Sequence, residues 1–168
     1  MWYVIWAVST KEYELEQRMK LTLPPDLYKR IWIPVREELR MYQGVEKMVE
    51  VKLFPGYVFV ETDDPEEIHE RIRREPAYIK FLDTEKGITP ISLWEEELIR
   101  LLTDEKGKAG LSVGIIDGGR LKVLQGPLKG KEDQIIRIDR HKKKAWIEMA
   151  LLGEKRKVGL GLRIVAKS

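Results

Sequence analysis

The sequence has no cysteine and only two histidines, His69 and His141. The lack of cysteine excludes disulfides and thiol chemistry and fits a reducing compartment. Because zinc sites in proteins are built mainly from cysteine and histidine, the composition also argues against a zinc site. No apolar run is long enough to cross a bilayer, and the start, MWYVIWAVS, lacks the basic residues and cleavage site of a secretory signal. We therefore expect a cytoplasmic protein that does not associate with membranes.

Sequence patterns for catalysis are also missing. Residues 126–132, GPLKGKE, faintly resemble a phosphate-binding loop, but only three residues separate the glycines and Glu132 stands where such a loop has Ser or Thr. Acidic residues gather at predicted helix starts, where capping accounts for them. Neither histidine has an obvious nucleophile or acid partner. We expect no enzymatic activity, no cofactor and no metal.

The sequence does contain abundant charge, and it is unevenly distributed. The 168 residues are 43% hydrophobic and 35% charged, which is typical of a globular protein with one or two small domains. Residues 114–168 have 14 basic and 6 acidic side chains, a net charge of +8, whereas residues 1–113 have 17 and 22, a net charge of −5. The C-terminal part should therefore attract polyanions, and the N-terminal part should repel them.

Residues 1–102 are predicted to form an α+β domain. Trp2 to Val8 is apolar on both alternating faces, which predicts a central strand of a sheet. Further strands are expected at residues 28–42, 45–53, 56–61 and 78–82. Gln43-Gly44 has the composition of a hairpin turn between two of them. Helices interleaved with a mostly antiparallel sheet indicate a ferredoxin-like sandwich.

Three helices are predicted from capping patterns, in which a capping residue is followed three positions later by Glu. The pairs are Ser9–Glu12, Asp64–Glu67 and Ser92–Glu95. The first two helices are expected to bury Leu15, Met19, Ile68 and Ile72. The third is expected to bury one side that consists of Trp94, Leu98, Leu101 and Leu102.

The amino-acid composition changes after residue 102. Residues 103–112, TDEKGKAGLS, are polar and glycine-containing, which predicts a linker. Residues 113–168 are expected to form a small β-barrel, because short β-rich runs alternate with glycines. The predicted strands are residues 120–124, 134–138, 145–150, 155–159 and 163–165.

Two stretches resemble a known family. Trp2-Tyr3-Val4 followed by a helix, with LFPGYVFV at residues 53–60, resembles the N-terminal (NGN) domain of NusG-family transcription elongation factors. GRLKVLQGPLKG at residues 119–130 resembles the KOW motif that opens their C-terminal domain. The resemblance implies a ferredoxin-like NGN domain and a small SH3-like KOW barrel, which is the architecture that the residue patterns predict independently.

The resemblance also implies that the NGN domain binds the clamp helices of the largest RNA polymerase subunit. The positions that match the family's apolar docking surface are Trp6, Phe54, Tyr57 and Phe59. Tyr57 and Phe59 are two residues apart and share one face of their strand, and aromatic anchors are common in binding hot spots. The alternative is that these aromatic residues are ordinary core, as we expect for Val58 and Val60 on the other face.

Two basic clusters indicate an RNA-binding surface on the KOW domain. They consist of Arg140, Lys142, Lys143 and Lys144 at one predicted hairpin, and Lys155, Arg156 and Lys157 at the next. Neighbouring turns of a barrel can lie at one end, where both clusters would contact RNA phosphates together. This charge resembles the LoaP group of NusG paralogues, processive antiterminators whose KOW domain recognises an RNA hairpin. The alternative is a basic face that only interacts with solvent.

Two further positions match contacts of other family members. His69 keeps the histidine of a His-Thr-Thr-Thr stretch that contacts the polymerase gate loop in specialised members, although the threonines are absent. Leu151 and Leu152 match the region through which the general factor contacts a ribosomal protein or the termination factor Rho. A second hypothesis therefore stays open: a general adaptor that binds such a protein without RNA specificity. In both cases we expect a monomer in a bacterial transcription complex.

Overall fold

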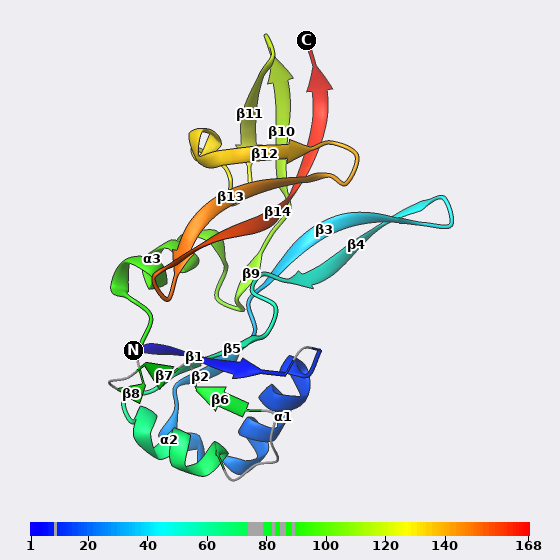
Figure 1. Cartoon of the computed structure of the whole chain (residues 1–168). Coiled ribbons are helices and arrows are strands. Elements are labelled where there is room, and N and C mark those ends of the chain that lie inside the picture. The colour runs from blue at the N-terminus through cyan, green and yellow to red at the C-terminus, as the bar shows by residue number, and fades with distance from the viewer. Residues whose placement is uncertain (9, 74–78, 82, 85–86, 89) are drawn as a thin grey trace. The chain divides into compact units, whose positions relative to one another are not determined.

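The computed structural model describes residues 1–8, 10–73, 79–81, 83–84, 87–88 and 90–168. The chain folds into two compact units, the first comprising Met1–Ile33 and Phe54–Glu96 and the second comprising Pro34–Leu53 and Glu97–Ser168 (Figure 1). Residues 34–53, expected in the N-terminal domain, thus group with the C-terminal residues. Independent folding of the predicted domains 1–102 and 113–168 stays a prediction. None of the described helices is long and apolar enough to span a membrane.

The first unit is built on a four-stranded sheet in the order β2-β5-β1-β6. Its strands are β1 (Trp2–Ala7), β2 (Arg30–Trp32), β5 (Tyr57–Glu61) and β6 (Ile79–Phe81). β1 pairs antiparallel with both β5 and β6, which confirms the predicted central strand. Residues 78 and 82, the ends of the strand predicted at 78–82, lie outside the described residues. The short strands β7 (Asp83–Thr84) and β8 (Gly87–Ile88) pair with each other.

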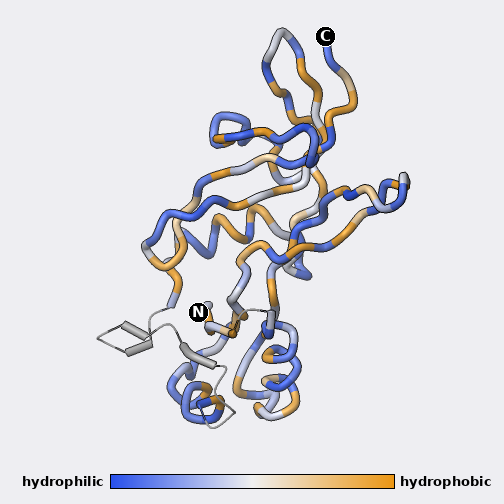
Figure 2. Tube along the Cα trace, turned by 45° about the vertical axis from the view of Figure 1, so that its right-hand side comes forward, coloured by the Kyte–Doolittle hydropathy of each residue, from blue (hydrophilic) through white to orange (hydrophobic). Residues whose placement is uncertain are grey.

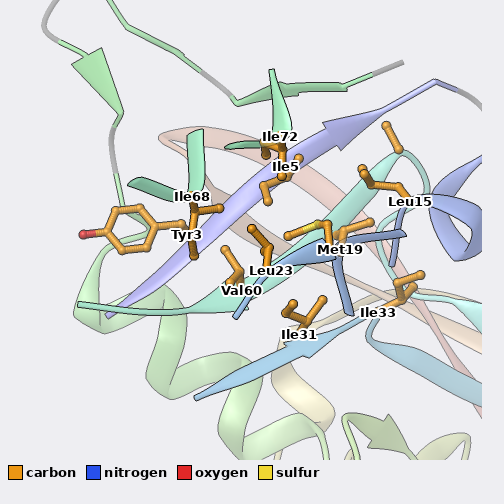
Figure 3. Packing of buried hydrophobic residues seen from close by; sticks show 12 residues of the cluster. Tyr3, Ile5, Leu15, Met19, Leu23, Ile31, Ile33, Val60, Ile68 and Ile72 are labelled. Atoms are coloured by element: carbon orange, nitrogen blue, oxygen red, sulfur yellow. The ribbon is translucent and has the colours of Figure 1, made fainter. Parts of the chain in front are cut away.

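Two helices, α1 (Glu12–Thr22) and α2 (Pro65–Ile72), pack on one face of this sheet (Figure 3). Their predicted apolar residues join the buried cluster with Ile5 and Val60 of the sheet. The cap of α2 is confirmed, because Asp64 Oδ1 accepts a hydrogen bond of 3.1 Å from the Glu67 N–H. Ser9, the predicted cap of α1, lies outside the described residues. A 3-10 turn, η1 (Pro25–Leu27), follows α1.

The third helix, α3 (Leu93–Leu102), starts as predicted but buries a different face. Its capping box is complete: Ser92 Oγ accepts from the Glu95 N–H at 3.1 Å, and a Glu95 carboxylate oxygen accepts from the Ser92 N–H at 3.0 Å. The capping contact holds Glu95 at the buried side together with Ile99 and Leu102. The neighbouring Trp94 therefore points outward and is 77% exposed, as Leu101 is by 62%, so the predicted apolar side was wrong for these two residues.

The second unit contains a long hairpin, β3 (Val35–Tyr42) and β4 (Val45–Lys52), with the short strand β9 (Lys108–Ala109) parallel to β3. The turn is at Gln43-Gly44 as predicted, with positive φ at both residues. The single strand predicted at 28–42 is divided into β2 and β3 at Pro34, which has no N–H for a sheet ladder. The predicted linker takes part in this sheet through β9.

The rest of the second unit is a five-stranded sheet in the order β11-β10-β14-β13-β12. The strands are β10 (Ser112–Asp117), β11 (Arg120–Gln125), β12 (Ile135–Asp139), β13 (Lys144–Leu151) and β14 (Glu154–Lys167), with a 3-10 turn η2 (Glu132–Gln134). β14 pairs antiparallel with β13 along its first half and parallel with β10 along its second, which bends the sheet into the expected small barrel. The sequence prediction missed β10 and divided β14 at its glycines.

Gly161 lies in the middle of β14 because a backbone approaches it closely, not because the chain turns there. A Cβ atom at Gly161 would lie 2.1 Å from the Glu37 carbonyl oxygen of β3. The β3–β4 hairpin is therefore packed directly against β14 within the second unit.

Candidate functional sites

An aromatic layer lies on the face of the first sheet opposite to α1 and α2. Its rings pack edge to face or tilted, with centroid distances of 4.7 Å for Trp2–Trp32, 5.5 Å for Trp32–Phe59 and 5.7 Å for Phe54–Phe59. Strand alternation places Phe59 on this face and Val58 and Val60 in the helix-covered core, as predicted. Phe59 has no exposed surface, so it supports this face rather than presenting itself on it.

Trp6 is the exposed member of the predicted polymerase-binding set. It pairs with Tyr57 across β1 and β5, and half of its surface is exposed, whereas Phe54 and Tyr57 are buried. Its indole lies over the Pro55-Gly56 turn, so that a Cβ atom at Gly56 would be 3.7 Å from Trp6 Nε1. The turn is held by α1, because Glu12 Oε1 accepts a hydrogen bond of 2.8 Å from the Gly56 N–H. The structure therefore presents one aromatic side chain at the surface, next to a turn that α1 holds in place.

The other positions expected from the family resemblance are in α2 and in the barrel. His69 is half-buried in α2. Leu151 is fully buried in the barrel core, and Leu152 is half-buried at the β13–β14 turn, where it has a positive φ. Only one residue of this apolar pair is thus accessible to a protein partner.

The first basic cluster lies on the turn between β12 and β13, a hydrophilic segment in Figure 2. Asp139 organises the turn, because its Oδ1 accepts a hydrogen bond of 2.9 Å from the Lys142 N–H. This hydrogen bond, with the charges of Lys142 and Arg137, lowers the pKa of Asp139. Arg140 and Lys142 are exposed, and no ion pair with another described residue holds either of them. These two cations are available to an external polyanion.

The other two lysines of this turn contact the β3–β4 hairpin instead of solvent. Lys143 Nζ forms an ion pair with Glu46 Oε2, and Arg163 Nη2 lies 3.2 Å from Glu46 Oε1. Lys144 Nζ lies 3.3 Å from Glu38 Oε2. Sequence reasoning missed these partners because they are about a hundred positions away and no local pattern marks them. The signal available in the sequence was that the hairpin carries carboxylates whereas the C-terminal part is basic.

Glu38 is the centre of a buried charge network. It is 1% exposed and receives two hydrogen bonds from Arg40, of 2.7 and 3.0 Å, while Arg36 Nε lies 3.7 Å away. Burial alone would raise the pKa of Glu38. The hydrogen bonds from Arg40 and the charges of Arg36 and Lys144 outweigh burial and hold this pKa below its usual value. Glu38 is therefore ionised at neutral pH and attracts Lys144 strongly.

The second basic cluster lies at the other end of the same ladder. Lys157 is opposite Glu148, whereas Lys144 is opposite Gly161, so four residues of strand, or about 13 Å, separate the two clusters. The expectation that both turns share one end of the barrel was wrong, because β13 and β14 form one long hairpin with a cluster at each end. Lys157 is exposed, and among the described residues no ion pair holds it.

Comparisons with known proteins agree with this architecture. Residues 1–102 match the family model for "Transcription termination factor nusG". A "Transcription termination/antitermination protein NusG" of Borreliella burgdorferi is 28% identical over 182 residues, covering 99% of this chain and 97% of the relative. The protein of the same name from Bacillus subtilis is 30% identical over 171 residues, covering 95% and 93%. The solved structure "Domain interaction in Thermotoga maritima NusG" has a TM-score of 0.54 at 24% identity, covering 95% of this chain and 92% of that one, and shows a shared fold.

An α+β sandwich followed by a small KOW-like β-barrel is the architecture of a two-domain transcription factor of the NusG type. The chain belongs to the NusG family and is a NusG-type transcription termination/antitermination factor. The resemblance of the LFPGYVFV and KOW stretches to this family is thus confirmed. The family is one of transcription factors rather than enzymes.

Proposed function

We propose that this protein is a processive antitermination factor of the LoaP kind, which acts as a monomer in the bacterial cytoplasm. In this proposal the first unit binds the clamp helices of the largest RNA polymerase subunit, and the KOW barrel binds an RNA hairpin. The observation that supports it most directly is the pair of exposed cations Arg140 and Lys142 on an ordered turn, in a segment of net charge +8. Such cations neutralise phosphates and release counterions, which strengthens RNA binding.

The polymerase contact is assigned to Trp6, with Phe54, Tyr57 and Phe59 as the rings behind it. All three are buried, so in this proposal they support the contact and do not make it themselves. His69 of α2 is a second, smaller contact in this proposal. A half-exposed indole that is paired across the sheet with a buried tyrosine resembles a binding hot spot.

Binding to a synthetic clamp-helix hairpin, measured by calorimetry, tests the polymerase contact. Trp6→Ala should weaken it by about 1–3 kcal/mol, the usual cost of truncating an aromatic anchor. Leu21→Ala is the matched control, since Leu21 is an apolar residue of the same unit that is 78% exposed. Equal affinities of the Trp6→Ala variant and the wild type would remove Trp6 from the interface.

A salt titration tests the RNA contact. For a labelled RNA stem-loop, Arg140→Gln/Lys142→Gln should flatten the slope of log affinity against log salt by about 1.5, because each lost phosphate contact removes roughly 0.7–0.9. The control, Lys106→Gln/Lys122→Gln, makes the same charge change at other exposed lysines of the second unit. Two results would count against the proposal: an unchanged slope removes the turn from the interface, and equal affinity for a scrambled RNA favours the general adaptor. Specificity must come from groove shape or loop bases, because phosphate contacts do not read sequence.

A further inference from the structure

The β3–β4 hairpin covers the outer face of β13 and β14. Alternation along β13 places Lys144 and Trp146 on this outer face, since Ala145 and Ile147 are buried in the barrel core. Trp146 lies against Gly159, where a Cβ atom would be 3.2 Å from the indole and 3.4 Å from the Arg36 guanidinium carbon of the hairpin. The hairpin thus lies close to the Trp146 ring of the outer face as well as to its charged side chains.

The cations that pair with the hairpin lie next to Arg140 and Lys142, for which the described part of the chain shows no ion pair. Lys143 follows Lys142 directly, and the Lys143 carbonyl oxygen accepts a hydrogen bond of 2.9 Å from the Leu162 N–H, which places Arg163 next to this turn. The Glu46 carboxylate forms ion pairs with both Lys143 and Arg163. A carboxylate that bridges two cations has the charge and the acceptor oxygens that a phosphate would also offer them.

We propose that the β3–β4 hairpin and RNA compete for this one face of the barrel, with Glu46 and Glu38 in the places of two phosphates. The inference rests on the proposed RNA binding and adds its regulation. RNA that binds first to Arg140 and Lys142 gains Lys143, Lys144 and Arg163 only when the hairpin leaves. The hairpin therefore lowers the affinity for RNA and limits it to ligands that displace these carboxylates.

The charge network is built so that the hairpin can leave without stranding a buried charge. Removing the only partner of a buried ion is strongly destabilising. Glu38, however, keeps Arg36 and Arg40 of its own strand when Lys144 departs, and the Arg40 hydrogen bonds are the shortest contacts it has. Glu46 is a quarter exposed, so water can solvate it at once. Both carboxylates can thus lose their partners on the barrel without being left buried and unpaired. A permanent structural contact would not need this property.

RNA affinity of charge-matched variants of the full chain tests the competition. The probe is a fluorescein-labelled RNA stem-loop of 16 base pairs, followed by anisotropy over a range of salt. Glu46→Gln should tighten binding by about three- to tenfold, because a larger fraction of molecules is binding-competent. It should also steepen the salt slope by up to about 1.5, as Lys143 and Arg163 join the phosphate contacts.

Glu50→Gln is the matched control. It makes the same charge change in the same hairpin, but the partner of Glu50 is Lys108, at 2.7 Å, which is outside both basic clusters. Equal gains for Glu46→Gln and Glu50→Gln would show a general charge effect and overturn the competition. If neither the wild type nor Glu46→Gln binds RNA, the proposed RNA function is wrong and the competition falls with it.

A distance measurement tests whether RNA displaces the hairpin from the barrel or only screens the charges between them. The chain has no cysteine, so Lys47→Cys on β4 and Lys122→Cys on β11 can be spin-labelled uniquely and their separation followed by double electron–electron resonance. RNA at saturation should broaden and shift the distance distribution. An unchanged distribution with RNA fully bound would show that hairpin and RNA occupy different faces, and the inference would be wrong although RNA binding stands.

Discussion

Replacing Gly161 by alanine tests the close approach of the hairpin to the barrel. The new Cβ atom would lie 2.1 Å from the Glu37 carbonyl oxygen and 2.9 Å from Leu111 Cδ1. The Leu111 methyl group can move, but the carbonyl belongs to the backbone of β3 and can move only with the strand. Gly161→Ala must therefore push β3 and β14 apart.

The expected cost follows from two opposing contributions. Overpacking costs about 1–3 kcal/mol, and the upper half of that range applies because the obstacle is backbone. Alanine also restricts the unfolded chain, which stabilises by about 0.4–1 kcal/mol where the native backbone tolerates it. We expect a net loss of about 2 kcal/mol in the free energy of unfolding of the second unit. Gly110→Ala is the control, since its nearest contact is a Glu37 carboxylate oxygen at 3.5 Å and only the small gain should appear.

Urea unfolding followed by circular dichroism measures the loss, and amide hydrogen exchange locates it. Gly161→Ala should lower the unfolding midpoint at an unchanged slope and speed the exchange of the β3 amides near Glu37. Stability within about 0.5 kcal/mol of wild type, together with unchanged β3 protection, would refute the packing of the hairpin on β14. It would also remove the physical basis for competition between hairpin and RNA.

Two further predictions concern single carboxylates. Because the folded-state pKa of Glu38 lies below its ordinary 4.5, Glu38 stabilises the second unit fully above about pH 4.5, and this contribution should be lost as the pH falls through the folded value. Glu38→Gln should flatten that part of the pH–stability curve, and an unchanged curve would contradict the network. Asp64→Ala should cost about 1 kcal/mol through loss of the α2 cap. Asp63→Ala, at an 81% exposed neighbour that pairs with Lys29 at 3.7 Å, should cost well under half as much; equal losses would refute the cap.

Local sequence patterns predicted the elements whose cause is local. The Ser92–Glu95 capping box and the Gln43-Gly44 turn are made by residues within four positions of each other, and both are present. The face that α3 buries was mispredicted because apolar spacing alone leaves the helix rotation open. The capping contact of Glu95 sets that rotation, and a buried glutamate does not resemble a core residue in the sequence.

The sequence did not predict features that depend on contacts between residues far apart in the chain. The glycines of β14 were interpreted as strand ends, because a sequence does not show that another backbone passes over Gly161. The excess of basic residues after Gly114 was interpreted as evidence for an external polyanion. Part of that charge is in fact neutralised within the chain, since Lys143 and Arg163 pair with Glu46, and Lys144 pairs with Glu38. An uneven charge distribution can thus stabilise the fold and attract a ligand with the same residues, and in this protein the two roles meet on one face of the barrel.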